Sequence, residues 1–562
     1  MKKLLLFALL SLTACKFLDV EPQVISKETF YKNDAEAKYG LAGVYGTMSH
    51  EAVYGNTYSL KISNTDDLCY YNRPASSIAM LEQYKFDSGN SYIYETWVRL
   101  YQGIRNANAF MEAISGSAFD PAGGLYAEAR FLRAYYHFLL AQAWGDVPLR
   151  DKEVTSHDGV MCATTPQYDV LTWCTREMEA CLAKLPLEPA QLPSRVNRVV
   201  AQGILARVYL FLAGESVQGG DKAAFWMQAR NYAKAVIETG TYRLNPSYSQ
   251  IFINMIEDLY DTDYHESMWE AEFLGDRSSA SYWSNGRIGN VIGLQSTGSS
   301  DYTSFKCNYA YGMYDGSLKL WDLYWTLDRT PEEDQLAYVS DLRQQWNMPP
   351  YNYAGSSTLP PYGTTGTGTC RPSIDKTPYS YSGVSTTADP LSAPAIRNCG
   401  KFRREVEYEG VKDAKIQNTT VNYPILRYAD VLLMYAEAAN EYEGRPSEEA
   451  YACVKAVRDR AGIKTLDFDQ YDQASFRTLV RNERGRELCF ESLRKWDLIR
   501  WGIFVESMRQ YADWTADDRW SKAGKADYAA AIGAAVGPRH IYLPVPSIEL
   551  GVNNLLEQNP LW

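Results

Sequence analysis

Two glutamates near the C-terminal end, Glu487 and Glu491, have the spacing of paired carboxylates on one face of a helix. Two carboxyl groups that flank a cleft hydrolyse glycosidic bonds when a raised pKa lets one of them act as the acid. Here basic residues crowd the pair, and neighbouring positive charge keeps carboxylates ionised. Those basic residues are Arg484, Arg486, Arg494 and Lys495. We therefore interpret the pair as part of a salt-bridge network and not as a catalytic site.

Other signatures of catalysis or metal binding are missing from the sequence. It contains no G-x-S-x-G, H-E-x-x-H or phosphate-loop motif. Its ten cysteines form no C-x-x-C pair and its five histidines are scattered, which is not the pattern of a zinc site. Two acidic clusters, Asp66–Asp67 and Glu332–Asp334, have ligand types that suit calcium, but we interpret them as solvated loop charge. The sequence predicts a protein that is not an enzyme, with no cofactor and no metal site.

Tyrosine is the outlier of the composition, with 43 Tyr against 18 Phe, alongside 14 Trp. Tyrosine and tryptophan combine an apolar face with a polar tip, which suits wet binding surfaces. A sugar ring stacks its C–H face on such a side chain while neighbouring polar groups bond its hydroxyls. We expect an exposed aromatic platform with polar neighbours. Its predicted members are Tyr282, Trp283, Asn285, Arg287, Tyr302, Tyr309 and Tyr311, with Tyr70 or Tyr71 at the rim beside Arg73.

The N-terminus carries an export signal that ends at a cysteine. A pair of lysines precedes an apolar stretch from Leu4 to Leu12, far shorter than the roughly 20 apolar residues of a membrane-spanning helix. The tetrapeptide Leu12-Thr13-Ala14-Cys15 resembles the bacterial lipobox. That resemblance implies that residues 1–14 are removed as a signal peptide and that a lipid on Cys15 tethers the chain to a membrane.

The charge of the chain limits its partners. Its formal net charge is −12, and loss of the two lysines of the signal would make it −14. Such a surface repels phosphate backbones and anionic headgroups, which argues against nucleic acid and against electrostatic docking on a membrane.

Helical patterns must supply the frame that positions the aromatic residues. Between 125 and 144, Leu132, Tyr135, Tyr136 and Leu139 recur on one helical face, and Gly145–Pro148 ends the pattern. Further helices are expected over 92–114, 166–185, 195–213, 222–239, 317–326, 425–441, 447–461 and 474–491. Cys174 and Cys181 share one face of such a helix, and Trp97, Trp496 and Trp501 are expected in the core.

The chain divides into three parts after the signal peptide. Residues 15–241 and 424–562 have the helical patterns, and their pairing resembles tetratricopeptide repeats. Residues 242–423 are rich in Gly, Ser, Thr, Asn and Tyr, with weak helical periodicity apart from 317–326. We expect an all-α frame that carries a loop-rich ligand lobe, because binding loops are commonly held on a rigid support.

Several segments together resemble the SusD/RagB family over essentially the whole mature chain. They are Cys15–Pro22, Phe131–Tyr136 with Gly145–Pro148, Leu426–Ala438, Arg484–Glu491, Arg494–Gly502, Tyr542–Pro546, Asn553 and Gln558–Pro560. The resemblance implies an all-helical SusD-like fold with four tetratricopeptide-like helix pairs beside a variable ligand lobe.

The same resemblance implies a function. It suggests a lipid-anchored protein of the bacterial outer membrane that faces the cell exterior, captures an oligosaccharide and sits as a lid on a SusC-like TonB-dependent transporter. Two alternatives stay open, because a fold does not fix its ligand. One is a peptide-binding receptor of the same architecture, and the other is a helical-repeat interaction scaffold without a small ligand. The abundance of Tyr and Trp favours sugar.

Overall fold

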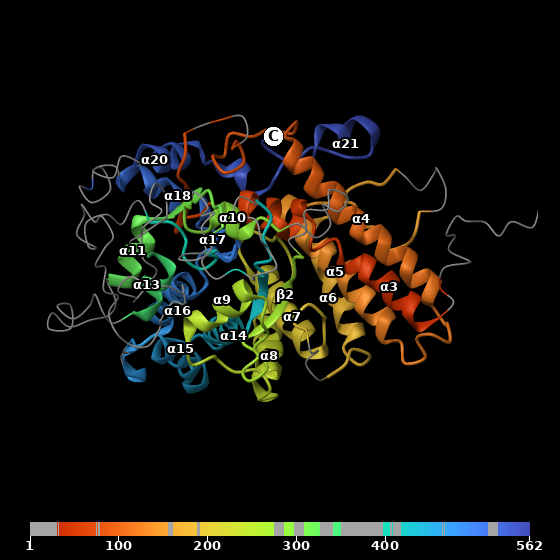
Figure 1. The fold of residues 1–562 in the computed structure, drawn as a ribbon, viewed down its shortest axis with the longest axis horizontal. Helices are drawn as coiled ribbons and strands as arrows, with labels where there is room; N and C mark the ends of the chain where they lie inside the picture. Colours follow the sequence, from red (N-terminus) through yellow and green to blue (C-terminus); the bar gives the residue numbers. More distant parts are fainter. Residues whose placement is uncertain are drawn as a thin grey trace, which may run out of the picture.

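A computed structural model shows the fold (Figure 1). It describes residues 31, 33–74, 76, 79–154, 161–187, 192–274, 286–296, 308–325, 341–349, 397–404, 407, 417–463, 465, 467–514, 517 and 526–562. Helices dominate the described residues, and the strands there form two short two-stranded sheets.

The first half of the chain folds into long helices. They are α3 (Asp34–Tyr45), η2 (Glu51–Gly55), η3 (Thr57–Ile62), α4 (Ser91–Ile114), α5 (Gly124–Trp144), α6 (Gln167–Cys181), α7 (Arg198–Ala213) and α8 (Lys222–Glu238). The expectations of helices over 92–114, 125–144, 166–185, 195–213 and 222–239 are confirmed to within a few residues. The two π-helical turns η2 and η3 lie where no helix was expected.

The second half adds shorter helices and continues the frame. They are α9 (Tyr248–Glu257), α10 (Ile288–Ile292), α11 (Leu318–Trp325), α13 (Leu342–Asn347), α14 (Tyr428–Glu443), α15 (Glu448–Arg460), η7 (Phe468–Gln470), α16 (Gln473–Leu488), α17 (Arg494–Arg500), α18 (Phe504–Asp513), α20 (Ala526–Ala535), η9 (Pro538–Ile541) and α21 (Ser547–Val552). The weak helical periodicity over 242–423 was misleading at α9, which turns an apolar face into the core through Ile251, Phe252 and Ile256.

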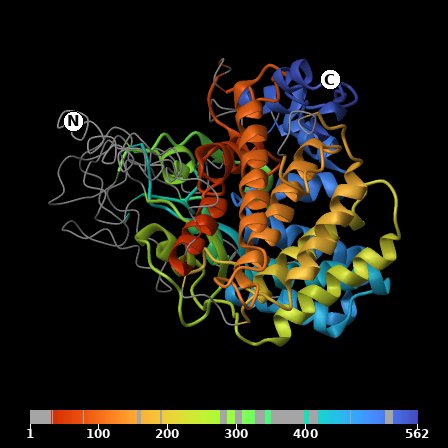
Figure 2. The same cartoon turned by 90° about the vertical axis from the view of Figure 1, so that its right-hand side faces the viewer.

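Consecutive helices pack on one another through the frame. Helix α4 lies against α5, α5 against α6, α6 against α7 and α7 against α8, and α8 then meets α14, which carries α15 and α16 (Figure 1). Figure 2 shows the same molecule from the side, with α4 and α5 in orange between green middle segments and blue C-terminal helices. This succession of helix pairs is the tetratricopeptide-like arrangement that the sequence indicated.

Local sequence sets where these helices begin and end. The Asn90 side chain accepts from the backbone amides of Tyr92 and Ile93 at the start of α4, which satisfies donors that the first helical turn leaves unpaired. Helix α5 ends at Gly145, whose φ of 77° is strained for any residue with a Cβ. Gly103 of α4 has a different role, since a Cβ there would lie 2.7 Å from the Tyr136 ring on α5.

Two antiparallel sheets join segments that are far apart in sequence. Strand β1 (Cys69–Tyr71) pairs with β3 (Tyr314–Gly316), and β2 (Ser267–Ala271) pairs with β4 (Tyr423–Arg427). The helix expected over 425–441 is therefore wrong at its start, where the chain is a strand before α14 begins. The five residues of β4 beside α7 and β2 are all buried, so they gave no alternation of buried and exposed positions to distinguish a strand from a helix.

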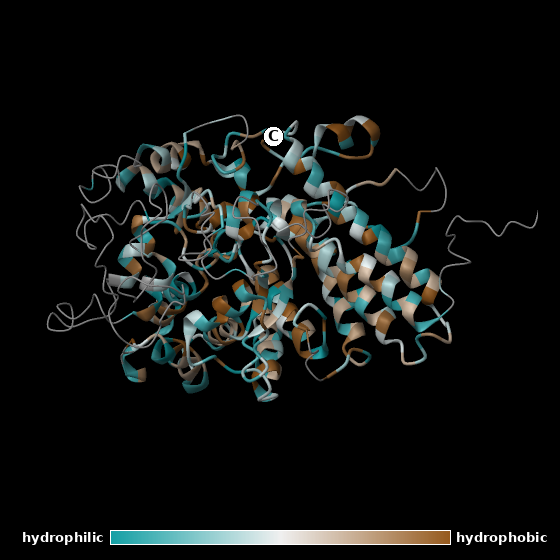
Figure 3. Ribbon diagram, viewed as in Figure 1, coloured by the Kyte–Doolittle hydropathy of each residue, from teal (hydrophilic) through white to brown (hydrophobic). Residues whose placement is uncertain are grey.

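One large apolar core runs through the helix pairs. Trp97, Trp496 and Trp501 are buried, as expected, and so are the thiols of Cys174 and Cys181 on α6. Hydropathy colouring of the ribbon shows brown apolar bands and teal hydrophilic bands alternating along the helices (Figure 3). No helix within the described ranges has both the length and the apolar character needed to cross a membrane.

Candidate ligand site

The predicted platform residues divide into two groups. Cys15, Tyr282, Trp283, Asn285 and Tyr302 lie outside the described residues. The structure does place the other members, which are Arg287, Tyr309, Tyr311, Tyr70 and Tyr71. It brings Arg287, Tyr309 and Tyr311 together and separates them from the two rim tyrosines.

Tyr309 and Tyr311 form an aromatic pair just before β3. Their ring centroids lie 4.9 Å apart with planes at 78°, the edge-to-face geometry that aromatic rings favour. Both side chains are half-buried, so each keeps part of its ring open to solvent. Partial burial, together with the neighbouring Tyr311, raises the pKa of Tyr309 above its ordinary value. The Tyr309 hydroxyl therefore stays protonated and able to donate a hydrogen bond at neutral pH.

Hydrogen bonds to the backbone hold this pair in place. The Tyr309 carbonyl accepts from Asn290 Nδ2 at 3.0 Å and from Arg404 Nη1 at 2.7 Å. The Tyr311 amide donates to the Asn290 carbonyl at 2.7 Å, and its carbonyl accepts from Arg73 Nη2 at 2.6 Å. A segment without helix or strand thus has its backbone fixed by three remote side chains.

Arg287 joins the same cluster through Asn290, the first-turn residue of α10 that also holds Tyr309. Its Nη2 donates to Asn290 Oδ1 at 3.1 Å and to Gln417 Oε1 at 3.2 Å. Its Nη1 lies 3.5 Å from Glu51 Oε1 at the first π-helical turn, and its backbone amide donates to the Gly55 carbonyl. We call Arg73, Arg287, Asn290, Tyr309, Tyr311 and Gln417 the tyrosine face.

The exposed rim predicted for Tyr70 and Tyr71 is wrong. Tyr70 is 0% exposed, its ring packs edge-on against Tyr511 and its hydroxyl donates to Asp315 at 3.4 Å. Tyr71 is buried edge-on against Tyr314. The reason is that β1 lies inside the fold, where it pairs with β3 and contacts α20, and Tyr511 of α18 packs on Tyr70.

The segment around Tyr70 and Tyr71 supports the tyrosine face instead of lining it. Asn72 Nδ2 donates to the Gly312 carbonyl at 2.8 Å and to Asp315 Oδ1 at 2.7 Å. Arg73, the next residue, reaches the Tyr311 carbonyl. Arg73 thus contacts the backbone of Tyr311, whereas the side chains of Tyr70 and Tyr71 are buried in the core.

The acidic pair Asp66–Asp67 is buried, so its interpretation as solvated charge is wrong. Asp67 binds Arg494 at 2.8 Å and Lys319 at 2.6 Å, while Asp66 accepts from the backbone amides of Leu68 and Cys69. The second acidic cluster, 332–334, lies outside the described residues. Across the part of the chain that the structure describes, no three Asp, Glu, His or Cys side chains gather as a metal site would require.

Glu487 and Glu491 lie inside a buried ion-pair network, as the interpretation of the sequence proposed. Glu487 binds Arg427 at 3.0 Å, Arg460 at 2.6 Å and Arg343 at 3.1 Å, and Glu491 binds Arg427 and Lys401. Burial opposes ionisation, but these arginines hold the pKa of Glu487 far below its ordinary value. The partners of the two glutamates come from other elements of the fold. They are not the basic residues expected from the sequence, which were Arg484, Arg486, Arg494 and Lys495. Glu487 is therefore not available as an acid with a raised pKa.

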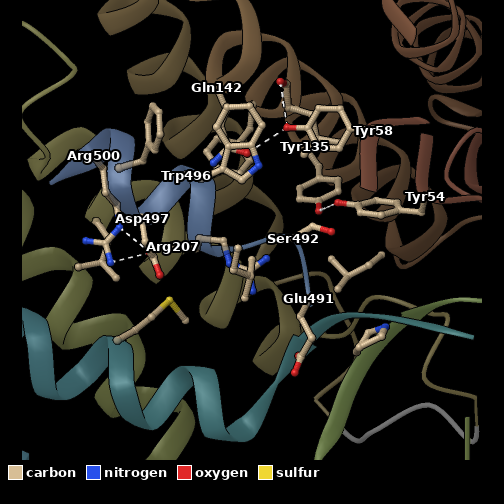
Figure 4. A pocket seen from close by; sticks show the side chains of 18 of the residues that line it. Tyr54, Tyr58, Tyr135, Gln142, Arg207, Glu491, Ser492, Trp496, Asp497 and Arg500 are labelled. Atoms are coloured by element: carbon tan, nitrogen blue, oxygen red, sulfur yellow. Dashed lines mark hydrogen bonds and ion pairs between the residues drawn. The ribbon is translucent and has the colours of Figure 1, made fainter. Parts of the chain in front are cut away.

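A small internal cavity lies where β4 and the end of α16 meet α5 and α7 (Figure 4). Its volume is about 50 Å³, and the close-up shows Tyr54 and Tyr135 meeting hydroxyl to hydroxyl, with Tyr58 donating to Gln142 at 3.0 Å. The side chains of Arg207, Asp497 and Arg500 line another side. That volume accommodates a few water molecules and no sugar ring. We therefore assign no ligand to it.

The tyrosine face has the parts that recognition of a polar ligand needs. Two partly open rings offer apolar surface, and Asn290 links their backbone to the Arg287 guanidinium, which bonds the exposed Gln417 amide. Sequence reasoning missed Asn290, Arg404 and Gln417. No local pattern marks them, because their importance comes from contacts with residues 19 to 130 positions away.

Comparison with known sequences matches this chain to one family in both halves. The profile described as "SusD family" matches residues 265–562, and the profile described as "Starch-binding associating with outer membrane" matches residues 16–210. A SusD-like protein of Formosa agariphila is 23% identical over 98% of this chain and 96% of its own length. The starch-binding protein SusD of Bacteroides thetaiotaomicron is 22% identical over 98% of this chain and 90% of its own length.

Solved structures give the same result for the fold. A SusD homologue from Bacteroides thetaiotaomicron has a TM-score of 0.79 at 25% identity, covering 95% of this chain and 98% of that one. A structure described as a laminarin-binding SusD-like protein has a TM-score of 0.65 at 21% identity, covering 95% of this chain and all of that one. The helical frame with its mixed middle part is therefore the fold that these proteins share.

Proposed function

This chain belongs to the SusD/RagB family, and we propose that it is a non-catalytic glycan-binding lipoprotein of the bacterial outer membrane. In this proposal Cys15 carries the lipid, the folded part faces the cell exterior, and captured oligosaccharide passes to a SusC-like TonB-dependent transporter. The observation that carries the proposal is the Tyr309–Tyr311 pair, two partly open rings fixed on a rigid frame beside polar side chains.

The geometry of the tyrosine face suits a sugar. A pyranose that stacks on one of the rings brings its hydroxyl rim toward Gln417 and Arg287, which supply an amide and a guanidinium. Because the backbone of both tyrosines is already held, little conformational entropy is lost when the ligand binds.

Tyr282, Trp283, Asn285 and Tyr302 remain proposed ligand contacts. The first three precede Arg287 by two to five residues, and Tyr302 precedes Tyr309 by seven. This short separation in sequence supports the proposal, because a chain spans at most about 3.6 Å per residue. We propose that they complete the platform.

Carbohydrate as the ligand class is supported by the relatives. The names of two of them state binding of starch and of laminarin, and one matching profile is described as associating with the outer membrane. The tyrosine face is compatible with those ligands. The lipid on Cys15 and delivery to a transporter are proposed from the lipobox and from family membership.

Binding of a glycan array and a peptide library to the full chain carrying Cys15→Ala tests the class of ligand. We expect glycans to bind and peptides not to bind. Selective binding of peptides would identify a peptide receptor of the same architecture, and binding of neither would favour an interaction scaffold. Turnover of a bound glycan would contradict the non-catalytic assignment.

Extraction in mild detergent followed by pull-down tests the partner. We expect the wild-type chain, labelled by a fatty-acid analogue, to bring down a TonB-dependent barrel protein. The Cys15→Ala chain serves as the matched control and should lose the label. Recovery of the wild-type chain alone, under conditions that keep other membrane complexes intact, would contradict the partnership.

A further inference from the structure

A groove on another part of the molecule has the features of a separate binding site. It lies between α4, the segment that follows α5 and the C-terminal helix α21, and its volume is about 360 Å³. That volume falls in the range of small-molecule pockets. None of its lining residues belongs to the tyrosine face.

The floor of this groove is apolar and rigid. Trp97, Ile104 and Leu556 are buried beneath it, and the Trp97 ring packs 5.0 Å from that of Tyr101. The Tyr101 hydroxyl donates to the Pro148 carbonyl at 2.8 Å, which ties α4 to the opposite wall.

Side-chain hydrogen bonds also hold both walls. Asn108 Nδ2 donates to the carbonyls of Arg150 and Lys152 at 3.0 and 3.1 Å. On the other wall, Asn553 Nδ2 donates to the Cys162 carbonyl at 2.8 Å. The groove is thus preformed, which reduces the entropy lost when a ligand is ordered in it.

The mouth of the groove leaves apolar side chains in solvent. Val552 is 64% exposed and Val154 is 42% exposed, and both line the groove. Ile548 and Leu555 beside it are 53% and 49% exposed, and Figure 3 shows α21 largely in brown. Isolated exposed apolar residues are ordinary, but a cluster around a concave surface marks a binding site.

Charge at the rim selects the kind of ligand. Arg105, Arg150 and Lys152 line the groove with Glu153 and Glu549. Arg150 faces Glu549. Partial burial raises the pKa of Glu549 above its ordinary value, although Trp97 and Arg150 act in the opposite direction. Among the described residues, no salt bridge or side-chain hydrogen bond engages Arg105 or Lys152, and both are exposed. Two cations are therefore left to face whatever fills the groove.

We propose that the groove between α4 and α21 is a second binding site that takes an amphipathic anion. Its ligand has an apolar chain or ring, which covers Trp97, Tyr101 and Val552, and one carboxylate or similar group, which meets Arg105 and Lys152. An uncharged apolar ligand leaves those cations unpaired, and a cationic one is repelled by them.

Calorimetric titration with three eight-carbon probes tests this site on the full chain carrying Cys15→Ala. The probes are octanoate, 1-octanol and octylammonium, which share an apolar chain and differ in charge. We expect octanoate to bind once per chain and about fivefold more tightly than octanol, with octylammonium weakest. Equal affinity for octanoate and octanol would overturn the assignment of an anion.

Substitutions at the rim and mouth locate the site. Arg105→Glu with Lys152→Glu should weaken octanoate about tenfold and strengthen octylammonium, and Val552→Asp should weaken both. Leu561→Asp and Arg445→Glu are the controls, since both residues are exposed outside the groove, and they should change nothing. Unchanged octanoate affinity in the folded rim and mouth variants would overturn the proposal.

The oligomeric state tests the other possible occupant of the groove, which is a second copy of this chain. Sedimentation should show the same monomer for wild type and Val552→Asp. If wild type forms a dimer that Val552→Asp abolishes, the groove is an interface between copies of this chain and the proposal is wrong. Glycan binding should be unchanged in every rim variant, so this test is independent of the tyrosine face.

Discussion

The ion-pair network around α16 and the tyrosine face satisfy their polar groups in opposite ways. In the network, charged side chains are buried and paired with one another, as Arg343 is with Asp341, Glu483 and Glu487. At the tyrosine face, side chains hold backbone carbonyls and leave the aromatic rings partly open. In the ion-pair network the charged groups bond to one another, whereas the tyrosine face leaves ring surface available for a ligand.

This difference implies that the ion-pair network stabilises the fold and that the tyrosine face recognises the ligand. The network joins α13, β4, α15 and α16 with Glu266, the residue just before β2, so that loss of one partner affects several elements at once. Within the described part of the tyrosine face, Asn290 is the member that bonds to both Tyr309 and Arg287. Ligand-facing residues can therefore change with less effect on the frame than the buried charges can.

The largest expected effect is on the frame. Glu487→Gln removes one negative charge from three buried arginines, and breaking a buried pair in this way costs about 3–5 kcal/mol. Denaturant titration followed by circular dichroism measures this loss in the free energy of unfolding. Affinity for glycan should be unchanged in the protein that remains folded. A loss below about 1 kcal/mol would show that the network does not hold the frame together.

Acid should weaken the frame before it affects ligand binding. Arg500 pairs with the buried Glu437 and, against the effect of burial, lowers its pKa from 4.5 to about 2, and the pKa of Glu483 falls likewise to about 2. Because the folded pKa is the lower one, the stabilisation is fully present above pH 4.5 and is lost as pH falls toward 2. Each group contributes about 3 kcal/mol. Unfolding followed from pH 7 to pH 2 should show this decline.

Glycan binding at the tyrosine face should not share the acid sensitivity of the network. Arginine and tyrosine do not titrate between pH 5 and pH 8, so glycan affinity should be constant over that range. A stability that is flat from pH 4.5 to pH 2, or an affinity that changes tenfold between pH 5 and pH 8, would contradict this comparison.

Asn290→Ala tests the residue that links Arg287 to the tyrosine pair. Removal of its amide leaves the Tyr309 carbonyl with Arg404 alone and frees Arg287 from one acceptor. We expect a cost of about 1–2 kcal/mol in unfolding and a weaker affinity for glycan, measured on the same preparation. Wild-type affinity in this variant would mean that the position of the tyrosine pair does not depend on Asn290.

The smallest effect is expected at an exposed ion pair of the frame. Lys455 and Asp459 lie 2.6 Å apart on the surface of α15 with about half of each side chain exposed. Asp459→Asn should change the free energy of unfolding by about 0.5 kcal/mol or less. It is the matched control for Glu487→Gln, since both substitutions replace a paired carboxylate by an amide. A cost equal to that of Glu487→Gln would show that burial does not distinguish the two pairs.

The sequence predicted the frame better than the site, for a physical reason. Helices such as α4 and α5 repeat an apolar face every few residues, so local spacing reveals them. Tyr70 carries no such signal, since its burial depends on Tyr511 and Asp315, which are hundreds of residues away. The partners of Glu487 were likewise misassigned, because Arg343 and Arg427 reach it from other elements while the arginines nearest in sequence point elsewhere.

Calorimetry on the paired substitution Tyr309→Ala with Tyr311→Ala tests the central claim most directly. The titrant is the tightest-binding oligosaccharide from the array, and Tyr442→Ala, at an exposed tyrosine on α14, is the control. We expect affinity to fall by about 1–3 kcal/mol, with the thermal midpoint near that of wild type and no change in the control. Wild-type affinity in a folded Tyr309→Ala, Tyr311→Ala chain would contradict the assignment of the tyrosine face as the glycan site.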